Sequence, residues 1–155
     1  MNIYFPKSQP KKPIHMRKKG VSSDFIEKRD LELMRLWNMA KQYAYEDKTK
    51  QYQMKDLYDL VSTLPCNGFY VSEESAWRYI QSRRKGRTPH LKSRHRRILF
   101  ERLYDIVMSL RLRASYVPIE LKRLMYKAMM MRAPCIGLSP AGIRRQIERL
   151  TKQTQ

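Results

Sequence analysis

The chain has 155 residues and carries 33 Lys and Arg against 14 Asp and Glu, for a formal net charge of +19. Hydrophobic residues make up 42% of it, which is enough for a modest core and excludes a fully disordered chain. No apolar run approaches the ~20 residues of a membrane span, and the first residues lack the apolar segment of a secretory signal. We therefore expect a cytoplasmic protein with no membrane partner, and two cysteines in a Lys-rich chain fit a reducing compartment.

The charge is unevenly distributed along the chain. Residues 1–21 hold six basic and no acidic residues, residues 22–82 hold eight basic and ten acidic, and residues 83–155 hold nineteen basic and four acidic. Glycine is scarce, whereas Leu, Met, Arg and Lys are common, which favours helices over strands. The sequence therefore predicts an all-α protein whose partner is a polyanion.

Residues 1–21 are expected to form a basic, flexible tail. The first predicted helix begins at Ser23 or Asp24, where Asp24 and Glu27 have the spacing of a capping box. Its apolar positions follow helical spacing: Ile26, Leu33, Leu36, Trp37 and Ala40. A second helix carries an apolar stripe at Met54, Leu57, Tyr58, Val61 and Leu64 and stops at Pro65; a third begins after Ser72, with Ala76, Trp77 and Ile80 facing inward.

Residues 83–97 hold eight Lys and Arg, two His and no acid, which predicts a basic linker that runs into the next helix. That helix begins near Ser93 or Arg94 and carries apolar residues at Ile98, Phe100, Leu103, Tyr104, Val107 and Leu110. Pro118 is suited to open the following helix, and Ser139 with Pro140 to open the last.

The second half of the chain repeats the first. Leu33 matches Phe100 and Leu36 matches Leu103 at an offset of 67, as does Ser72 with Ser139, but Pro65-Cys66 matches Pro134-Cys135 at an offset of 69. The second copy is therefore predicted to have two extra residues before Pro134 and to lack counterparts of Phe69 and Tyr70. Each copy is expected to contain three helices.

In each copy a support helix precedes two helices that are joined by a short Gly-containing turn, and a serine caps the last helix. This is the layout of a helix-turn-helix unit. Over about 22–150 the chain resembles the tandem helix-turn-helix proteins of prophages and mobile elements. The resemblance implies two three-helix units, 22–82 and 98–155, joined by the basic linker and bound to nucleic acid, with duplex DNA preferred over RNA.

Basic side chains of the linker and of the outer faces of the two last helices are the candidate contacts to phosphates and bases. They are Arg78, Arg83, Arg84, Lys85, Arg87, Lys92, Arg94, Arg96, Arg97, Arg144, Arg145, Arg149 and Lys152. The slightly acidic segment 22–82 is the candidate surface for a protein partner or for self-association. The aromatic residues Tyr43, Tyr45, Tyr52, Phe69 and Tyr70 would form that surface or, alternatively, the core.

Catalytic and metal-binding patterns are absent from the sequence. There is no Gly-rich phosphate loop, the carboxylates do not cluster, and Cys66, Cys135, His90 and His95 lack the spacing of a zinc site. We expect no catalytic residue, no metal and no cofactor, with a nuclease as the remaining enzymatic alternative. The predicted function is regulatory or architectural DNA binding. The alternatives are an RNA-binding component of a ribonucleoprotein and a phage-type structural or assembly protein associated with packaged nucleic acid.

Overall fold

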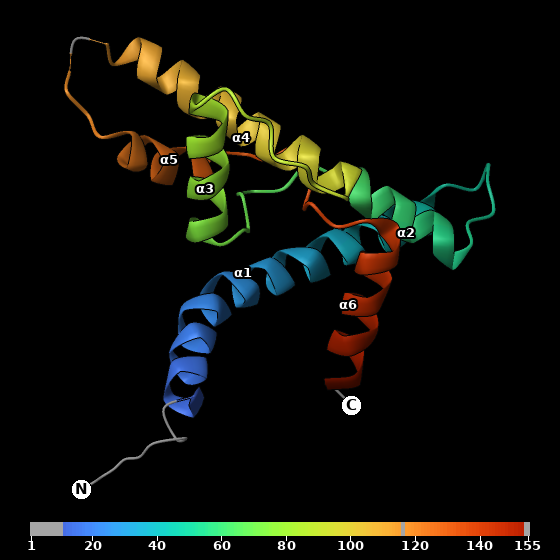
Figure 1. Ribbon diagram of the computed structural model, residues 1–155. Coiled ribbons are helices and arrows are strands. Elements are labelled where there is room, and N and C mark those ends of the chain that lie inside the picture. The colour runs from blue at the N-terminus through green and yellow to red at the C-terminus, as the bar shows by residue number, and fades with distance from the viewer. Residues whose placement is uncertain (1–10, 116, 154–155) are drawn as a thin grey trace, which may run out of the picture.

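The computed structural model describes residues 11–115 and 117–153, with side chains from residue 25 onward. Six helices make up this part of the chain, and it contains no strand (Figure 1). They are α1 (Lys11–Glu46), α2 (Met54–Thr63), α3 (Glu73–Arg84), α4 (Arg94–Arg113), α5 (Leu121–Met129) and α6 (Pro140–Gln153). The prediction of an all-α chain is confirmed. None of the helices in the described ranges combines the length and apolar character of a membrane-crossing segment.

Three of the predicted helix starts coincide with serine caps. Ser72, Ser93 and Ser139 precede α3, α4 and α6. Their Oγ atoms accept hydrogen bonds from the backbone N–H groups of Ser75, Arg96 and Gly142 at 3.1, 3.3 and 3.2 Å. A cap satisfies a backbone donor that has no partner within the helix, and it is worth about 1 kcal/mol.

α1 begins at Lys11 and not at Ser23 or Asp24, so Asp24 and Glu27 lie within the helix and do not cap it. Of the basic tail that was predicted to be flexible, residues 11–21 belong to α1, and residues 1–10 lie outside the described part. Lys, Arg and Met favour helices, and Pro13 falls in the first turn, where its missing N–H removes no helical hydrogen bond.

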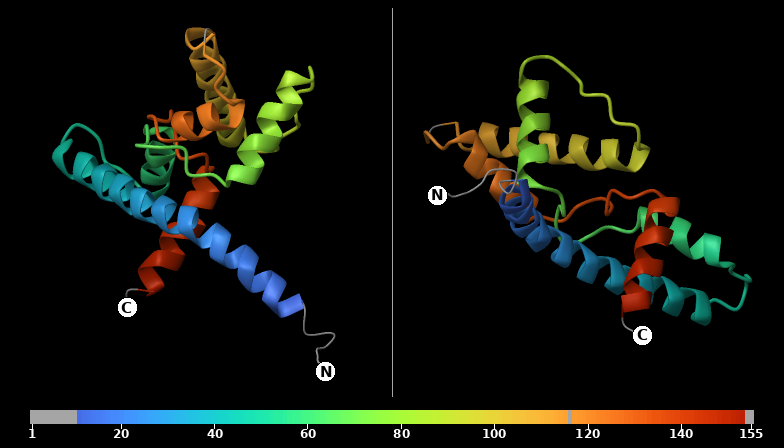
Figure 2. Two further views of the ribbon diagram at one scale, coloured as in Figure 1. Left: turned by 90° about the vertical axis from the view of Figure 1, so that its left-hand side faces the viewer. Right: turned by 60° about the horizontal axis from the view of Figure 1, so that its bottom comes forward.

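The helices pack in two groups, and each group contains helices from both halves of the chain. α1 packs against α2, and α4 packs against α5. The third helix of each half lies on the pair of the other half, because α6 contacts α2 and α1 whereas α3 contacts α4 and α5 (Figures 1 and 2). We call these the α1–α2–α6 group and the α3–α4–α5 group. The tandem units 22–82 and 98–155 are therefore not confirmed, and the structure corrects the grouping: an apolar stripe shows that a helix is covered, not which helices cover it.

The two halves repeat at an offset of 67 without a gap. α1 ends at Glu46 and α4 at Arg113, and α2 and α5 begin at positions that differ by the same offset. In the connections before α3 and α6, Phe69 corresponds to Ile136, and both are buried. The predicted two-residue shift is therefore wrong, since the Pro-Cys pairs occupy different places in the two connections.

The two connections meet at a single antiparallel bridge. The N–H of Cys66 donates to the carbonyl of Ala133, and the N–H of Ala133 donates to the carbonyl of Cys66, both at 2.9 Å. Cys66 and Ala133 are themselves 67 residues apart, so exchanging the halves maps this pair onto itself. The bridge thus lies on a pseudo-two-fold axis, where the chain crosses from one group to the other.

One buried cluster of apolar side chains runs through both groups. The predicted core residues Leu33, Leu36, Trp37 and Ala40 are buried, as are Leu57, Tyr58, Val61, Ala76, Ile80, Phe100, Leu103 and Val107. Met54 and Ile98 were also predicted inward but are 56% and 42% exposed. Leu99 is buried in place of Ile98, because the buried face of α4 is rotated by one residue from the predicted face.

Gly137 and Gly86 provide a matched pair for testing the connection before α6. Both have a left-handed backbone, with φ of +86° and +82°. An added Cβ at Gly137 would lie 2.6 Å from Cδ2 of the buried Leu99, whereas one at Gly86 would meet nothing within 4 Å. We expect Gly137→Ala to cost about 2–4 kcal/mol in the free energy of unfolding, and Gly86→Ala about 1 kcal/mol. Urea unfolding measures both, and equal losses would contradict this packing.

Candidate nucleic-acid interface

Grouping the helices by packing changes where the positive charge lies. Residues 65–138, which include the α3–α4–α5 group and the linker, hold 16 Lys and Arg against 5 Asp and Glu. Residues 11–64 and 139–155, which include the α1–α2–α6 group, together hold 16 against 9. The larger excess, +11 against +7, is therefore on the α3–α4–α5 group and its linker. The basic helix α6, predicted to dock on nucleic acid, belongs to the group with the smaller excess.

The linker between α3 and α4 is fixed at both ends. At its start, Gly86 takes the left-handed conformation, and the N–H of Arg87 donates to the carbonyl of Ser82 at 2.9 Å, which closes the end of α3. At its end, Nη1 of Arg97 donates to the carbonyl of Leu91 at 2.6 Å. Leu91 itself packs against the core. The segment is therefore anchored by its apolar residue and presents its polar side chains outward.

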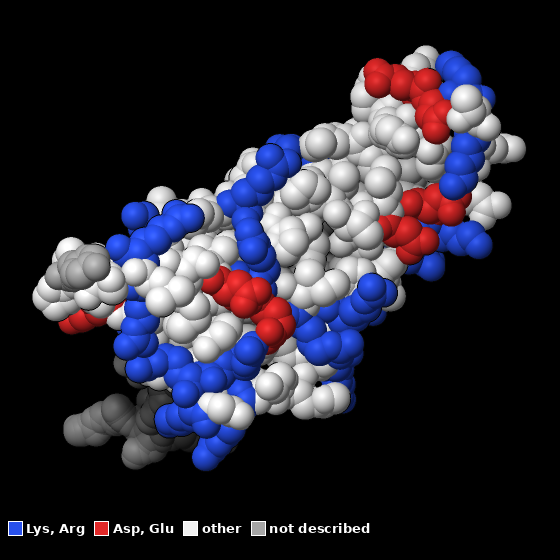
Figure 3. Space-filling view, turned by 90° about the horizontal axis from the view of Figure 1, so that it is seen from above, with Lys and Arg blue, Asp and Glu red and all other residues white. Residues whose placement is uncertain are grey.

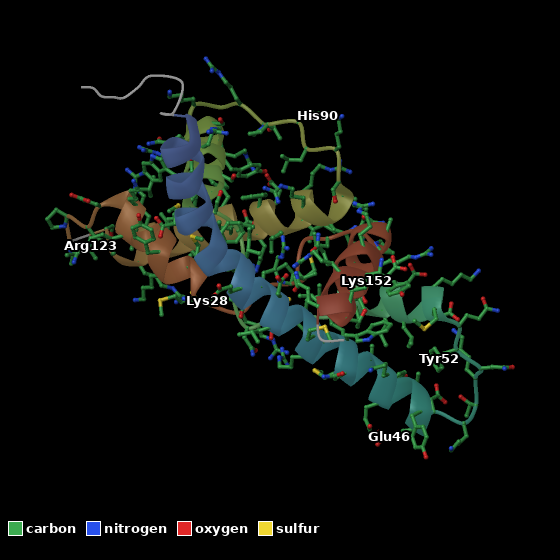
Figure 4. The ribbon with its side chains drawn as sticks, turned by 90° about the horizontal axis from the view of Figure 1, so that it is seen from below. Lys28, Glu46, Tyr52, His90, Arg123 and Lys152 are labelled. Atoms are coloured by element: carbon green, nitrogen blue, oxygen red, sulfur yellow. The ribbon has the colours of Figure 1, made fainter. Side chains whose placement is uncertain are left out.

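Several predicted contact residues are exposed and make no side-chain ion pair within the described ranges. They are Arg84, Lys85, Arg87, Lys92, Arg94, Arg145 and Lys152. The first five lie within eleven residues of one another, on the end of α3, the linker and the start of α4. Figure 4 shows that His90 of the same linker points away from the helices. Figure 3 shows Lys and Arg gathered towards the lower edge of the view, with acidic side chains in separate groups.

Other predicted contact residues are engaged by the protein itself. Arg83 pairs with Glu101 of α4, and its guanidinium lies 4.4 Å from the ring centroid of Tyr104. Only 24% of the Arg83 side chain is exposed. Arg83 therefore holds α3 against α4, and the interpretation of it as a phosphate contact is not supported by its position. Arg97 likewise donates to the linker backbone.

On α6 the engaged residues are Arg149 and Arg144. Nη2 of Arg149 donates to Asp30 of α1 at 2.8 Å, which fixes α6 to α1. Arg144 lies 3.6 Å from Glu148 in an exposed pair, as Arg78 lies 2.7 Å from Glu74 on α3. Exposed pairs of this kind are worth little, so Arg144 and Arg78 remain able to bind an anion.

The cysteines do not form a reactive or metal-binding site. Cys66 and Cys135 are buried free thiols, and desolvation, opposed only weakly by Arg35, raises the pKa of Cys66 to about 12. Desolvation also raises the pKa of Cys135. No group of His, Cys, Asp or Glu within the described residues could hold a metal ion.

The aromatic residues that were predicted as a protein-binding surface divide between surface and core. Tyr43 and Tyr45 are 55% and 75% exposed, and Tyr52 is half-buried against Tyr43. Phe69 is buried and Tyr70 is half-buried. A protein-binding surface at the α1–α2 end of the molecule could therefore contain Tyr43, Tyr45 and Tyr52, but not the buried Phe69.

Comparison with protein-family models, with curated proteins and with solved structures finds no match to this chain.

Proposed function

We propose that this chain binds nucleic acid, with duplex DNA as the preferred form, through the cationic surface of the α3–α4–α5 group and its linker. The observation that carries the proposal is the group of five exposed cations without acidic partners at the end of α3, along the linker and at the start of α4. Lys and Arg side chains that neutralise phosphates release condensed counterions, which supplies affinity without reading sequence.

The proposed role is architectural or regulatory binding within a cytoplasmic nucleoprotein assembly, and it involves no catalytic step. The connection between α2 and α3 runs from 64 to 72, which is longer than a tight helix-turn-helix turn, and α6 belongs to the group with the smaller excess of positive charge. Contacts to the phosphate backbone therefore account for the proposed binding better than insertion of α6 into a groove. Arg145 and Lys152 would add peripheral contacts.

The test is fluorescence anisotropy of a labelled random duplex of about 30 base pairs, titrated with the full chain over a series of salt concentrations. We expect the logarithm of the binding constant to fall linearly with that of the salt concentration, with a slope near −0.9 for each phosphate contacted. Unlabelled single-stranded and structured RNA serve as competitors. Binding that is absent at about 50 mM salt contradicts the proposal, and RNA that competes far better than duplex favours a ribonucleoprotein role.

A triple variant of the linker tests which surface binds. We expect Arg87→Gln with Lys92→Gln and Arg94→Gln to reduce the salt slope by about 2–3 and to weaken binding roughly 10- to 100-fold at about 100 mM salt. The charge-matched control changes Lys41, Lys48 and Lys50 to Gln at the α1–α2 end, where each lies over an aromatic ring. If both triple variants weaken binding equally, net charge and not this surface is responsible.

A further inference from the structure

Two arginines, on α1 and α6, share one carboxylate, and a third arginine, on α4, lies near the first of them. Arg29 is on α1 and Arg96 is in the first turns of α4, and these two are 67 residues apart, so they occupy equivalent places in the two halves. Arg149 reaches the same place from α6 through Asp30. We call Arg29, Arg96 and Arg149 the arginine cluster.

The carboxylate of Asp30 accepts a hydrogen bond from each of two of these arginines. Its Oδ2 accepts from Nη2 of Arg149 at 2.8 Å, and its Oδ1 accepts from Nη2 of Arg29 at 3.3 Å. The side chains of Asp30 and Arg29 are 14% and 17% exposed. Nε of Arg29 is buried and has no hydrogen-bond partner. A buried charged donor without an acceptor is costly, so Arg29 is not fully satisfied by Asp30.

Arg96 has no carboxylate of its own in the described part of the chain. Its guanidinium lies over the ring of Phe100, 4.8 Å from the centroid, and its side chain is half-buried. Desolvation, followed by the positive charge of Arg29, lowers the pKa of Arg96 below its usual value. The two equivalent arginines therefore lie close enough for the charge of Arg29 to act on Arg96.

We propose that the arginine cluster is a binding site for a phosphate group. Guanidinium groups bind phosphate oxygens through paired N–H donors, and a phosphate brings the negative charge that three arginines and one carboxylate lack. Arg96 is half-buried and the side chain of Arg149 is 40% exposed, so two of the three arginines reach solvent. A phosphate there would bind α1, α4 and α6 together at the place where the two groups cross.

The inference rests on the proposed function in one respect, since the backbone of a nucleic acid is one source of the phosphate. A free phosphate or a phosphorylated small molecule is the other source. Both present the same tetrahedral oxyanion to the arginines, so inorganic phosphate is a suitable probe for the site itself, and duplex DNA is the probe for its source.

The first measurement is the melting temperature of the full chain in inorganic phosphate and in chloride at equal ionic strength. For a dissociation constant of about 1 mM, we expect roughly 20 mM phosphate to raise the melting temperature by about 4 °C. The rise should disappear in Arg29→Gln and in Arg96→Gln. It should persist in Arg102→Gln, which removes the same charge from an exposed position on α4. A wild-type chain that phosphate does not stabilise, or an Arg29→Gln variant that it still stabilises, overturns the proposal.

The second measurement identifies the source. If backbone phosphate occupies the cluster, Arg29→Gln reduces the salt slope of duplex binding by about 1 and weakens binding several-fold. If a free phosphate compound occupies it, the variant loses the thermal shift and binds duplex as the wild type does. Either result supports the phosphate site. A wild-type chain that gives the thermal shift and binds neither duplex nor RNA would overturn the proposed function alone.

Discussion

Cutting the chain after Gly86 is expected to leave neither half folded as a monomer, and mixing the halves is expected to restore a helical 1:1 complex. The fragments would be 1–86, with α1, α2 and α3, and 87–155, with α4, α5 and α6. In the first, α3 lacks the α4–α5 pair on which it packs, and the α1–α2 pair lacks α6. The second fragment has the reciprocal defects.

The apolar burial that each fragment loses is large compared with the stability of a small domain. α3 buries Ala76, Tyr79 and Ile80 against the other half, and α6 buries Ile143 and Ile147. Full burial of a large apolar side chain contributes about 1.5–3 kcal/mol, so losing one exchanged helix removes several kcal/mol from each group. The total stability of a small domain is about 5–15 kcal/mol. A single half therefore retains too little burial to stay folded alone.

Circular dichroism and sedimentation of each fragment, alone and mixed, provide the measurement. We expect weak, non-cooperative helical signal from single fragments, or a homodimer in which two copies exchange their third helices. The mixture should unfold cooperatively. A fragment 1–86 that is a stable monomer and melts cooperatively would restore the sequential grouping of the helices.

The helices could be predicted from the sequence, but their partners could not. Ser72, Ser93 and Ser139 identify helix starts because a cap is a local hydrogen bond. Packing is not local, and the same apolar stripe on α6 suits either pair. Matching the two identical Pro-Cys pairs produced the wrong two-residue shift between the halves. The sequence contained a signal for the gapless offset of 67, because that offset pairs two apolar residues, Phe69 and Ile136, and both are buried in the structure.

The cationic linker was likewise visible in the sequence, whereas the use of individual arginines was not. In the sequence, Arg83 and Arg149 look like their exposed neighbours on the same helices. Only the fold places Glu101 beside Arg83 and Asp30 beside Arg149. Arg29 was missed because it lies in a segment whose net charge is slightly negative, next to an aspartate. The signal that could have found it is its equivalence to Arg96 at the offset of 67.

The second large effect concerns a buried carboxylate that exists in one half only. Glu32 is 5% exposed, and it accepts hydrogen bonds from Arg35 at 2.5 and 2.9 Å and from the backbone N–H of Asn67 at 2.6 Å. In the other half the equivalent positions are Leu99 and Pro134. Because Pro134 has no N–H, no acceptor is needed there, and Leu99 fills the space with an apolar side chain.

We expect Glu32→Leu to lower the free energy of unfolding at pH 7 by about 3 kcal/mol, since it leaves the Asn67 N–H without its acceptor and Arg35 without its partner. Asn67→Pro alone should cost about 1–2 kcal/mol. The double variant reproduces the pair of the other half, so its loss should be smaller than the sum by about 1–2 kcal/mol, measured by urea unfolding in a double-mutant cycle. Strict additivity would show that the Glu32–Asn67 contact contributes nothing.

The same carboxylate makes the stability of the wild-type chain depend on acid. The hydrogen bond from Arg35 and, after it, the one from Asn67 hold the pKa of Glu32 below its usual value of 4.5, against the opposing effect of burial. A carboxyl whose pKa is lower in the folded chain stabilises the fold fully above the unfolded pKa, and this stabilisation is lost as the pH falls through the folded pKa. Glu32→Leu lacks that contribution at every pH. The difference in unfolding free energy between wild type and Glu32→Leu should therefore be constant from about pH 8 to pH 6 and should shrink towards about pH 3. A difference that stays constant down to that pH would show that the pKa of Glu32 is the same in the folded and the unfolded chain.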